Sequence, residues 1–178
     1  INAWIYSLYE LNSAVYKCSI GNTADLTGAP HAWDEGWAFY AGSLQSEGGT
    51  DGYLGYTLAE KRCTNFQTCG SAGTSGESAD RPSKVNRDLL SYYNSGLAHL
   101  QAAECADANA DLDEIKKLMT VPLVQGTMKY AYYCDPAYGN EGAEACAEGY
   151  AFAAAVLPVV DALCDSTAAA TIKSNMIP

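Results

Sequence analysis

The sequence lacks any uninterrupted apolar run of the roughly 20 residues that a helix needs to cross a bilayer. Its longest apolar segment, YAFAAAVLPVV at residues 150–160, contains Pro158. Basic residues are scarce, since 10 lysines and arginines stand against 21 acidic residues, and the formal net charge is -11. This balance excludes the basic surface typical of nucleic-acid-binding proteins, but it suits cations. We therefore expect a soluble chain that has no nucleic-acid partner and does not insert into a membrane.

Sequence motifs of the common enzyme classes are also missing. The chain contains no G-x-S-x-G, H-E-x-x-H, P-loop or dinucleotide-binding fingerprint. It also lacks the Glu-x-x-His pattern of dinuclear iron proteins. These absences favour a binding or structural protein over an enzyme.

Cysteines, in contrast, are numerous for a chain of 178 residues. No C-x-x-C pair occurs and the two histidines, His31 and His99, are far apart, which argues against a zinc site of the usual spacing. We therefore predict an oxidising compartment and about three disulfides, with one cysteine left over. The pairing is left open by the sequence. The seven cysteines are Cys18, Cys63, Cys69, Cys105, Cys134, Cys146 and Cys164.

Apolar residues recur at helical spacing along most of the chain, and alternation typical of strands is hard to find. We predict an all-α bundle of about six helices that forms a single domain over residues 1–178. A turn is expected from Asp107 to Asp111. The chain opens on Ile1 without a methionine, which we interpret as a processed product or a domain excised from a longer chain. The expected helices span residues 1–18, 31–44, 53–63, 84–105, 111–133 and 142–164.

Two parts of the chain resemble each other. AVYKC at residues 14–18 resembles YAYYC at 130–134, and HAWDEGWAFYAG at 31–42 resembles EACAEGYAFAAA at 144–155. We interpret them as two helix pairs, in halves of approximately 1–46 and 117–164, with the helices 53–63 and 84–105 between them. Such a repeat predicts packing about a pseudo-twofold axis.

The repeated helices carry ionisable residues at matching positions. His31 and Glu35 are spaced i and i+4, as are Glu144 and Glu148, and Asp34 lies beside the first pair. If the two faces meet inside a bundle, their carboxylates need a cation, because an unpaired buried carboxylate costs several kcal/mol. Iron, manganese and zinc suit this donor set, with calcium as a further alternative. The alternative interpretation is a solvated, salt-bridged surface.

Other polar residues are interpreted more simply. His99 lies among apolar residues and is expected to be a hydrogen-bonded core histidine. The acidic residues from Asp107 to Glu114 lack the glycine and the terminal glutamate of a calcium loop, so they more simply begin a helix.

Four segments resemble a known family. HAWDEGWAFYAGSL (31–44), GYTLAEKRC (55–63), LMTVPLVQGTMKYAYYC (118–134) and EGAEACAEGYAFAAAVLPVV (141–160) are similar to the iron-assimilating, high-CO2-inducible periplasmic proteins of algae, which respond to iron deficiency. The resemblance implies secretion to the periplasm or cell surface, domains that can occur in tandem, and a role in iron acquisition without an established enzyme activity.

We therefore expect a non-catalytic protein that holds iron through His31, Asp34, Glu35, Glu144 and Glu148. A small anion would complete the iron's shell, and a membrane-bound iron transporter or reductase would be the partner. Two alternatives stay open: a ferroxidase-like oxidase with carboxylate-bound iron, and a structural, disulfide-stapled cell-surface protein.

Overall fold

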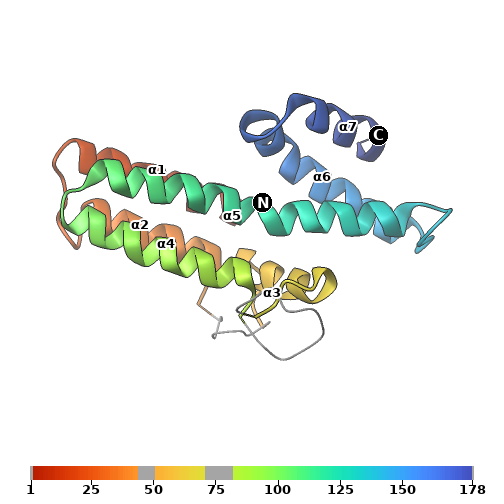
Figure 1. Cartoon of the computed structure of the whole chain (residues 1–178), viewed down its shortest axis with the longest axis horizontal. Helices are drawn as coiled ribbons and strands as arrows, with labels where there is room; N and C mark the ends of the chain where they lie inside the picture. The colour runs from red at the N-terminus through yellow and green to blue at the C-terminus, as the bar shows by residue number, and fades with distance from the viewer. Residues whose placement is uncertain (1, 44–50, 71–81, 178) are drawn as a thin grey trace. The chain divides into compact units, whose positions relative to one another are not determined.

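The computed structural model describes residues 2–43, 51–70 and 82–177, and these residues form helices joined by loops (Figure 1). An isolated bridge between Cys69 and Ser83 is the one β-type pairing in the described residues. The all-α prediction is confirmed, although α7 was not expected. Residues 44–50 and 71–81 lie outside the described residues. The helices are α1 (Asn2–Ser19), α2 (Ala29–Ala41), α3 (Gly55–Phe66), α4 (Lys84–Gln101), α5 (Cys105–Cys134), α6 (Ala143–Leu163) and α7 (Ser166–Met176).

The chain divides into two compact units, Ile1–Met119 and Thr120–Pro178, which we call unit 1 and unit 2. Unit 1 holds α1 to α4 and the first half of α5. Unit 2 holds the second half of α5 with α6 and α7. The assignment of the chain to a single domain and the internal repeat both stay predictions.

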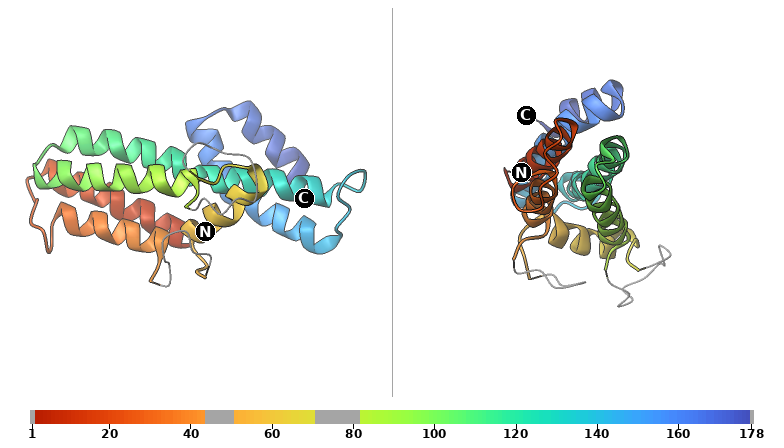
Figure 2. Two further views of the ribbon diagram at one scale, coloured as in Figure 1. Left: turned by 60° about the horizontal axis from the view of Figure 1, so that its bottom comes forward. Right: turned by 90° about the vertical axis from the view of Figure 1, so that its left-hand side faces the viewer.

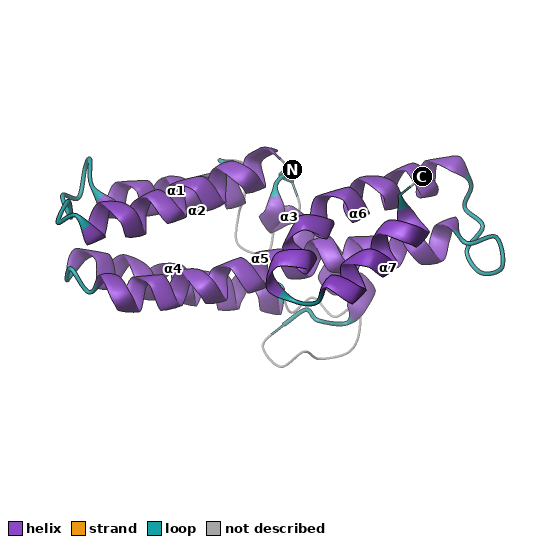
Figure 3. Ribbon diagram, turned by 90° about the horizontal axis from the view of Figure 1, so that it is seen from above, coloured by secondary structure: helices purple, strands orange, loops and turns teal. Residues whose placement is uncertain are grey.

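Unit 1 is a bundle in which α1 and α2 form an antiparallel hairpin, and α4 lies beside the first half of α5 (Figures 2 and 3). Gly36 allows the close approach of α1 and α2, because a Cβ atom there would lie 2.7 Å from Leu11 Cδ2. At the same crossing the Ser7 hydroxyl donates to the Gly36 carbonyl oxygen at 2.7 Å. The fully buried side chains of this core include Leu11, Trp33, Tyr40, Leu89, Leu100, Leu112 and Ile115.

A buried polar network joins α2, α3 and α4 in unit 1. The Glu60 side chain has no exposed surface, and its Oε1 accepts from the Ser83 backbone N–H and from Asn86 Nδ2, both at 2.7 Å. The Tyr40 hydroxyl donates to Asn86 Oδ1 at 2.6 Å. Burial raises the pKa of Tyr40 well above its ordinary value, so this phenol stays a neutral donor. Since buried donors and acceptors are costly when unmatched, the network fixes how these helices meet.

The predicted turn from Asp107 to Asp111 is wrong, because α5 already begins at Cys105. The chain reverses instead through Ala102–Glu104, where Ala103 takes a left-handed φ of 60°. Two backbone bonds close the end of α4, from Ala103 N–H to Leu100 O and from Glu104 N–H to His99 O. Asp107 then lies in the first turn of α5, where a carboxylate suits the helix dipole.

The disulfide prediction is confirmed. Three bonds form, Cys18–Cys105, Cys63–Cys69 and Cys134–Cys146, and Cys164 is free and exposed. The first bond ties α1 to the start of α5 within unit 1. The third ties the end of α5 to the start of α6 within unit 2.

The core of unit 2 is small. Val156 and Val160 of α6 meet Ala169 of α7, and Leu123, Val124, Leu157 and Ile172 pack around them. Pro158 lies inside α6 and does not end it. In the described residues α6 has the length and composition to cross a membrane, with a mean hydropathy of 1.4 over its most apolar window. One such helix is weak evidence for a span, because core helices of water-soluble proteins pass the same test.

Candidate functional site

The ionisable residues of α2 lie on its outer face. Ala32, Trp33, Gly36 and Tyr40 turn inward and are buried, which leaves the intervening positions toward solvent. His31 Nε2 lies 3.5 Å from Glu35 Oε1, an ion pair that the i, i+4 spacing and the salt-bridged-surface interpretation both allow, and the role of these residues as metal ligands stays a prediction. These two side chains are about half exposed, at 48% and 46%. Asp34 is also exposed, on the neighbouring part of the helix.

Glu10 of α1 joins this pair, although the sequence did not predict it. Its carboxyl group lies close enough to Glu35, across the α1–α2 seam, for the negative charge of Glu35 to act on it. The pKa of Glu10 is raised, mainly by burial and next by the negative charge of Glu35, while the positive charges of Lys17 and His31 act in the opposite direction. Two negative charges brought together across the seam repel each other, and a bound cation would relieve that repulsion. The one sequence feature that could have pointed to Glu10 is that it is the only acidic residue in residues 2–19.

An aromatic pair flanks the carboxyl groups. The rings of Tyr6 and Phe39 stack with centroids 5.4 Å apart, and each residue is one helical turn from Glu10 or Glu35 on its own helix. Tyr6 and Phe39 are partly exposed, at 56% and 38%. The carboxyl pair thus has an apolar wall on one side and His31 on the other.

The tryptophans of α2 pack the core of unit 1 and do not surround the carboxylates. Trp33 is 1% exposed, and its Nε1 donates to the Tyr93 carbonyl oxygen at 2.8 Å. Trp37 meets the Tyr93 ring edge-on at 4.9 Å. These rings make α2 rigid beneath its ionisable face.

The second predicted pair lies in unit 2. Glu144 and Glu148 are both exposed on α6, and Glu144 occupies the first helical turn, where a carboxylate suits the helix dipole. The two pairs belong to different units, so their convergence on one cation stays a prediction. Within residues 2–43, 51–70 and 82–177, no three His, Cys, Asp or Glu side chains form a ready-made metal cage. A cation at Glu10, His31 and Glu35 would therefore require these side chains to reorient.

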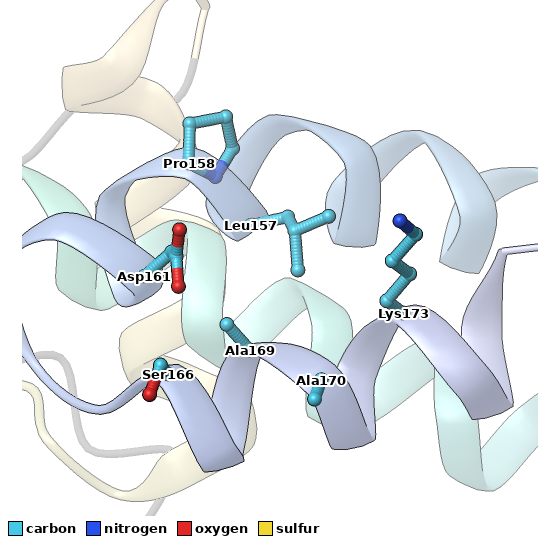
Figure 4. Close-up of a pocket in the computed structure, with 7 residues that line it drawn as sticks. All are labelled: Leu157, Pro158, Asp161, Ser166, Ala169, Ala170 and Lys173. Atoms are coloured by element: carbon cyan, nitrogen blue, oxygen red, sulfur yellow. The ribbon is translucent and has the colours of Figure 1, made fainter.

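Two further polar features, at His99 and between α6 and α7, are structural. His99 Nδ1 lies 2.9 Å from Asp111 Oδ2, which confirms the expected hydrogen bond and links α4 to α5, but the His99 side chain is 30% exposed and does not lie in the core. In unit 2 a shallow hollow of about 350 Å3 lies between α6 and α7 (Figure 4). Asp161 and Lys173 contribute opposite charges to its wall, so the hollow has no net attraction for a cation.

Comparison with known proteins identifies the family. Residues 2–173 match the Fea1 family, which is described as low iron-inducible periplasmic protein. The chain belongs to the Fea1 family. No curated protein and no solved structure matches it.

Family membership confirms the resemblance seen in the sequence and the periplasmic location. An oxidising periplasm also explains why disulfides hold this Fea1 protein together. The match runs from α1 into α7, so both carboxylate pairs lie inside the family's domain. Induction by low iron links the protein to iron supply.

Proposed function

We propose that this Fea1 protein binds iron in the periplasm and holds it as cargo for uptake, without transforming it. The observation that carries the proposal is the cluster of Glu10, Glu35 and His31 on the outer face of α1 and α2. Burial and the charge of Glu35 raise the pKa of Glu10, and His31 Nε2 lies 3.5 Å from Glu35 Oε1. Induction of the family by low iron supports the choice of metal.

The donor set suits iron chemically. Carboxylate oxygens and an imidazole nitrogen are ligands that iron, manganese and zinc accept, whereas calcium prefers oxygen alone. Iron would relieve the repulsion between Glu10 and Glu35 and would take a third donor from His31. Water or a small anion such as phosphate or carbonate would complete the shell. Asp34 would attract the incoming cation, because it adds negative charge to the same face.

Release would follow protonation. Ligands must be deprotonated to bind a metal, so affinity falls as the pH drops and protons compete with iron for its ligands. The released iron would pass to a membrane-bound transporter or reductase. Glu144 and Glu148 would supply a second carboxylate pair, either to the same ion or to another one.

The test is metal binding by the purified chain with its disulfides intact. The protein is loaded with ferric citrate or, without oxygen, with ferrous iron, and bound iron is quantified after desalting. Glu10→Gln, Glu35→Gln and His31→Gln should each weaken iron binding by at least about tenfold, since each removes a ligand, and glutamine keeps the side-chain shape of glutamate. Glu114→Gln, which alters an exposed carboxylate paired with Lys117, is the matched control and should bind iron normally.

Glu148→Gln examines the second pair. Weaker binding in both Glu35→Gln and Glu148→Gln, with one iron per chain in the wild type, would support one shared ion. Loss only in the α1–α2 variants would assign the site to unit 1. Wild-type protein without bound iron, or identical binding by all the variants, would refute the proposal.

A further inference from the structure

Two exposed tyrosines of unit 2 lie ring beside ring at the turn between α5 and α6. The ring centroids of Tyr132, on the last turn of α5, and Tyr138, in the following loop, are 5.8 Å apart, with 30° between the ring planes. Tyr132 is 54% exposed and Tyr138 is 70% exposed. Exposed aromatic rings usually stand singly, so a pair that is both close and open to solvent is a distinct chemical feature.

The backbone holds this pair in place. The Gly139 N–H donates to the Tyr132 carbonyl oxygen at 3.1 Å, which folds the loop back onto the end of α5. Asp135 stabilises the turn, because its carbonyl oxygen accepts from the Tyr138 N–H and its side chain accepts from the Ala137 N–H. The adjacent Cys134–Cys146 disulfide closes the base of the loop. The contact between the two rings is therefore part of the fold of this turn.

We propose that Tyr132 and Tyr138 are a site of oxidative cross-linking, at which a peroxidase-type one-electron oxidant with hydrogen peroxide couples the two rings into dityrosine. Each phenol loses one electron and its hydroxyl proton. The two phenoxyl radicals then form a carbon–carbon bond between ring positions ortho to the oxygens. The hydrogens on those two carbons move to the oxygens as the rings become aromatic again. The two electrons and two protons reduce one hydrogen peroxide to two water molecules.

Other tyrosines lack this combination of features. Tyr9, Tyr16 and Tyr53 are more than 60% exposed, but no tyrosine ring packs against them in the described part of the chain. Tyr6 stacks on Phe39, which cannot form dityrosine. Coupling at Tyr132 and Tyr138 would fasten the loop permanently to α5 beside the existing disulfide. This modification is independent of iron binding.

Within the described residues, Tyr133 is the one other tyrosine whose ring packs against Tyr132. Its ring centroid also lies 5.8 Å from that of Tyr132, but the ring planes are tilted by 56° and Tyr133 is less exposed. Cleavage of the chain before Asp135 separates the two possible products. After the disulfides are reduced, a bond from Tyr132 to Tyr138 joins two fragments, whereas a bond from Tyr132 to Tyr133 stays within one.

The experiment uses the full chain at low concentration, with Cys164 alkylated first so that its thiol does not consume oxidant. The protein is treated with a peroxidase and hydrogen peroxide, and dityrosine fluorescence is followed. The disulfides are then reduced, the chain is cleaved before aspartates, and the masses of the fragments are measured. We expect the fragments carrying Tyr132 and Tyr138 to be joined, with the loss of two hydrogen atoms.

Matched variants decide the assignment. Tyr132→Phe and Tyr138→Phe keep the rings and the fold, and each should abolish the joined fragment and most of the intramolecular dityrosine signal. Tyr53→Phe removes an exposed phenol elsewhere and should leave both unchanged. The proposal is overturned if the joined fragment is absent from the wild type, or if Tyr138→Phe forms as much intramolecular dityrosine as the wild type does.

Discussion

Removal of the Cys18–Cys105 disulfide should destabilise unit 1 far more than removal of Cys63–Cys69, although both bonds lie in that unit. A disulfide stabilises mainly by restricting the unfolded chain, and the effect grows with the length of the loop that it closes. The two bonds span 87 and 6 residues respectively. All four cysteines lie in unit 1, so the comparison is made within one cooperative structure.

The loop lengths set the magnitudes. The chain-entropy relation gives about 4.5 kcal/mol for the separation of 87 residues and about 2 kcal/mol for the separation of 6. Since small domains are stable by about 5–15 kcal/mol, loss of the long-range bond removes a large part of the total. With a urea dependence of about 1–3 kcal/mol per molar, the midpoint of unfolding should fall by at least about 1.5 M.

Tryptophan fluorescence reports this transition specifically. Trp4, Trp33 and Trp37 all lie in unit 1, and unit 2 contains no tryptophan. Urea unfolding of Cys18→Ala/Cys105→Ala and Cys63→Ala/Cys69→Ala is therefore followed by fluorescence, with far-ultraviolet circular dichroism reporting on the whole chain. Cys134→Ala/Cys146→Ala, which removes the bond of unit 2, serves as the control and should leave the fluorescence midpoint nearly unchanged. Equal midpoints for the two unit 1 variants would refute the argument from loop length.

Three smaller predictions concern single side chains. Tyr40→Phe should lower the free energy of unfolding by about 1–2 kcal/mol, because it leaves the buried Asn86 Oδ1 without its hydroxyl donor. An unchanged midpoint of urea unfolding would contradict this role. Ala103→Gly should raise stability by about 0.5–1 kcal/mol, since φ is 60° there and glycine adopts that conformation without strain; the thermal midpoint measures the gain. The raised pKa of Glu10 means that its contribution to stability is greatest below its ordinary pKa of 4.5 and is lost as the pH rises through the raised value. Metal-free Glu10→Gln should therefore be about 0.2–0.5 kcal/mol more stable than the wild type near neutral pH, with no gain in acid, because the substitution removes a partly buried charge and its repulsion from Glu35; a pH series of urea titrations tests the sign.

Much of the fold could be read from local pattern. Apolar residues at helical spacing predicted six helices close to those observed, because burying one face of a helix imposes that spacing on the sequence. The exceptions were α7, which was not expected, and the turn after α4. Acidic residues at positions 107–111 are compatible with a loop and with the first turn of a helix, so local pattern does not distinguish the two. The disulfide from Cys18 to Cys105, at the start of α5, is a tertiary contact.

The residues of the candidate site also fall into those that local spacing predicts and those that it does not. His31 and Glu35 were found because a spacing of four residues places two side chains together on any helix. Glu10 was missed because its partner is 25 positions away on another helix, and no periodicity links the two. The contact of Tyr132 with Tyr138 was missed for a similar reason, since it depends on how an irregular loop folds back.

The sequence by itself determined the helical class, the oxidising compartment, the acidic character and the family. These properties follow from composition, short-range spacing and motifs, which remain the same wherever the helices pack. Only the tertiary structure decided which cysteines pair, that Glu10 meets Glu35, and that Glu60 is buried in a hydrogen-bond network. Those contacts join residues distant along the chain, and they exist only once the packing of apolar faces has brought the helices together.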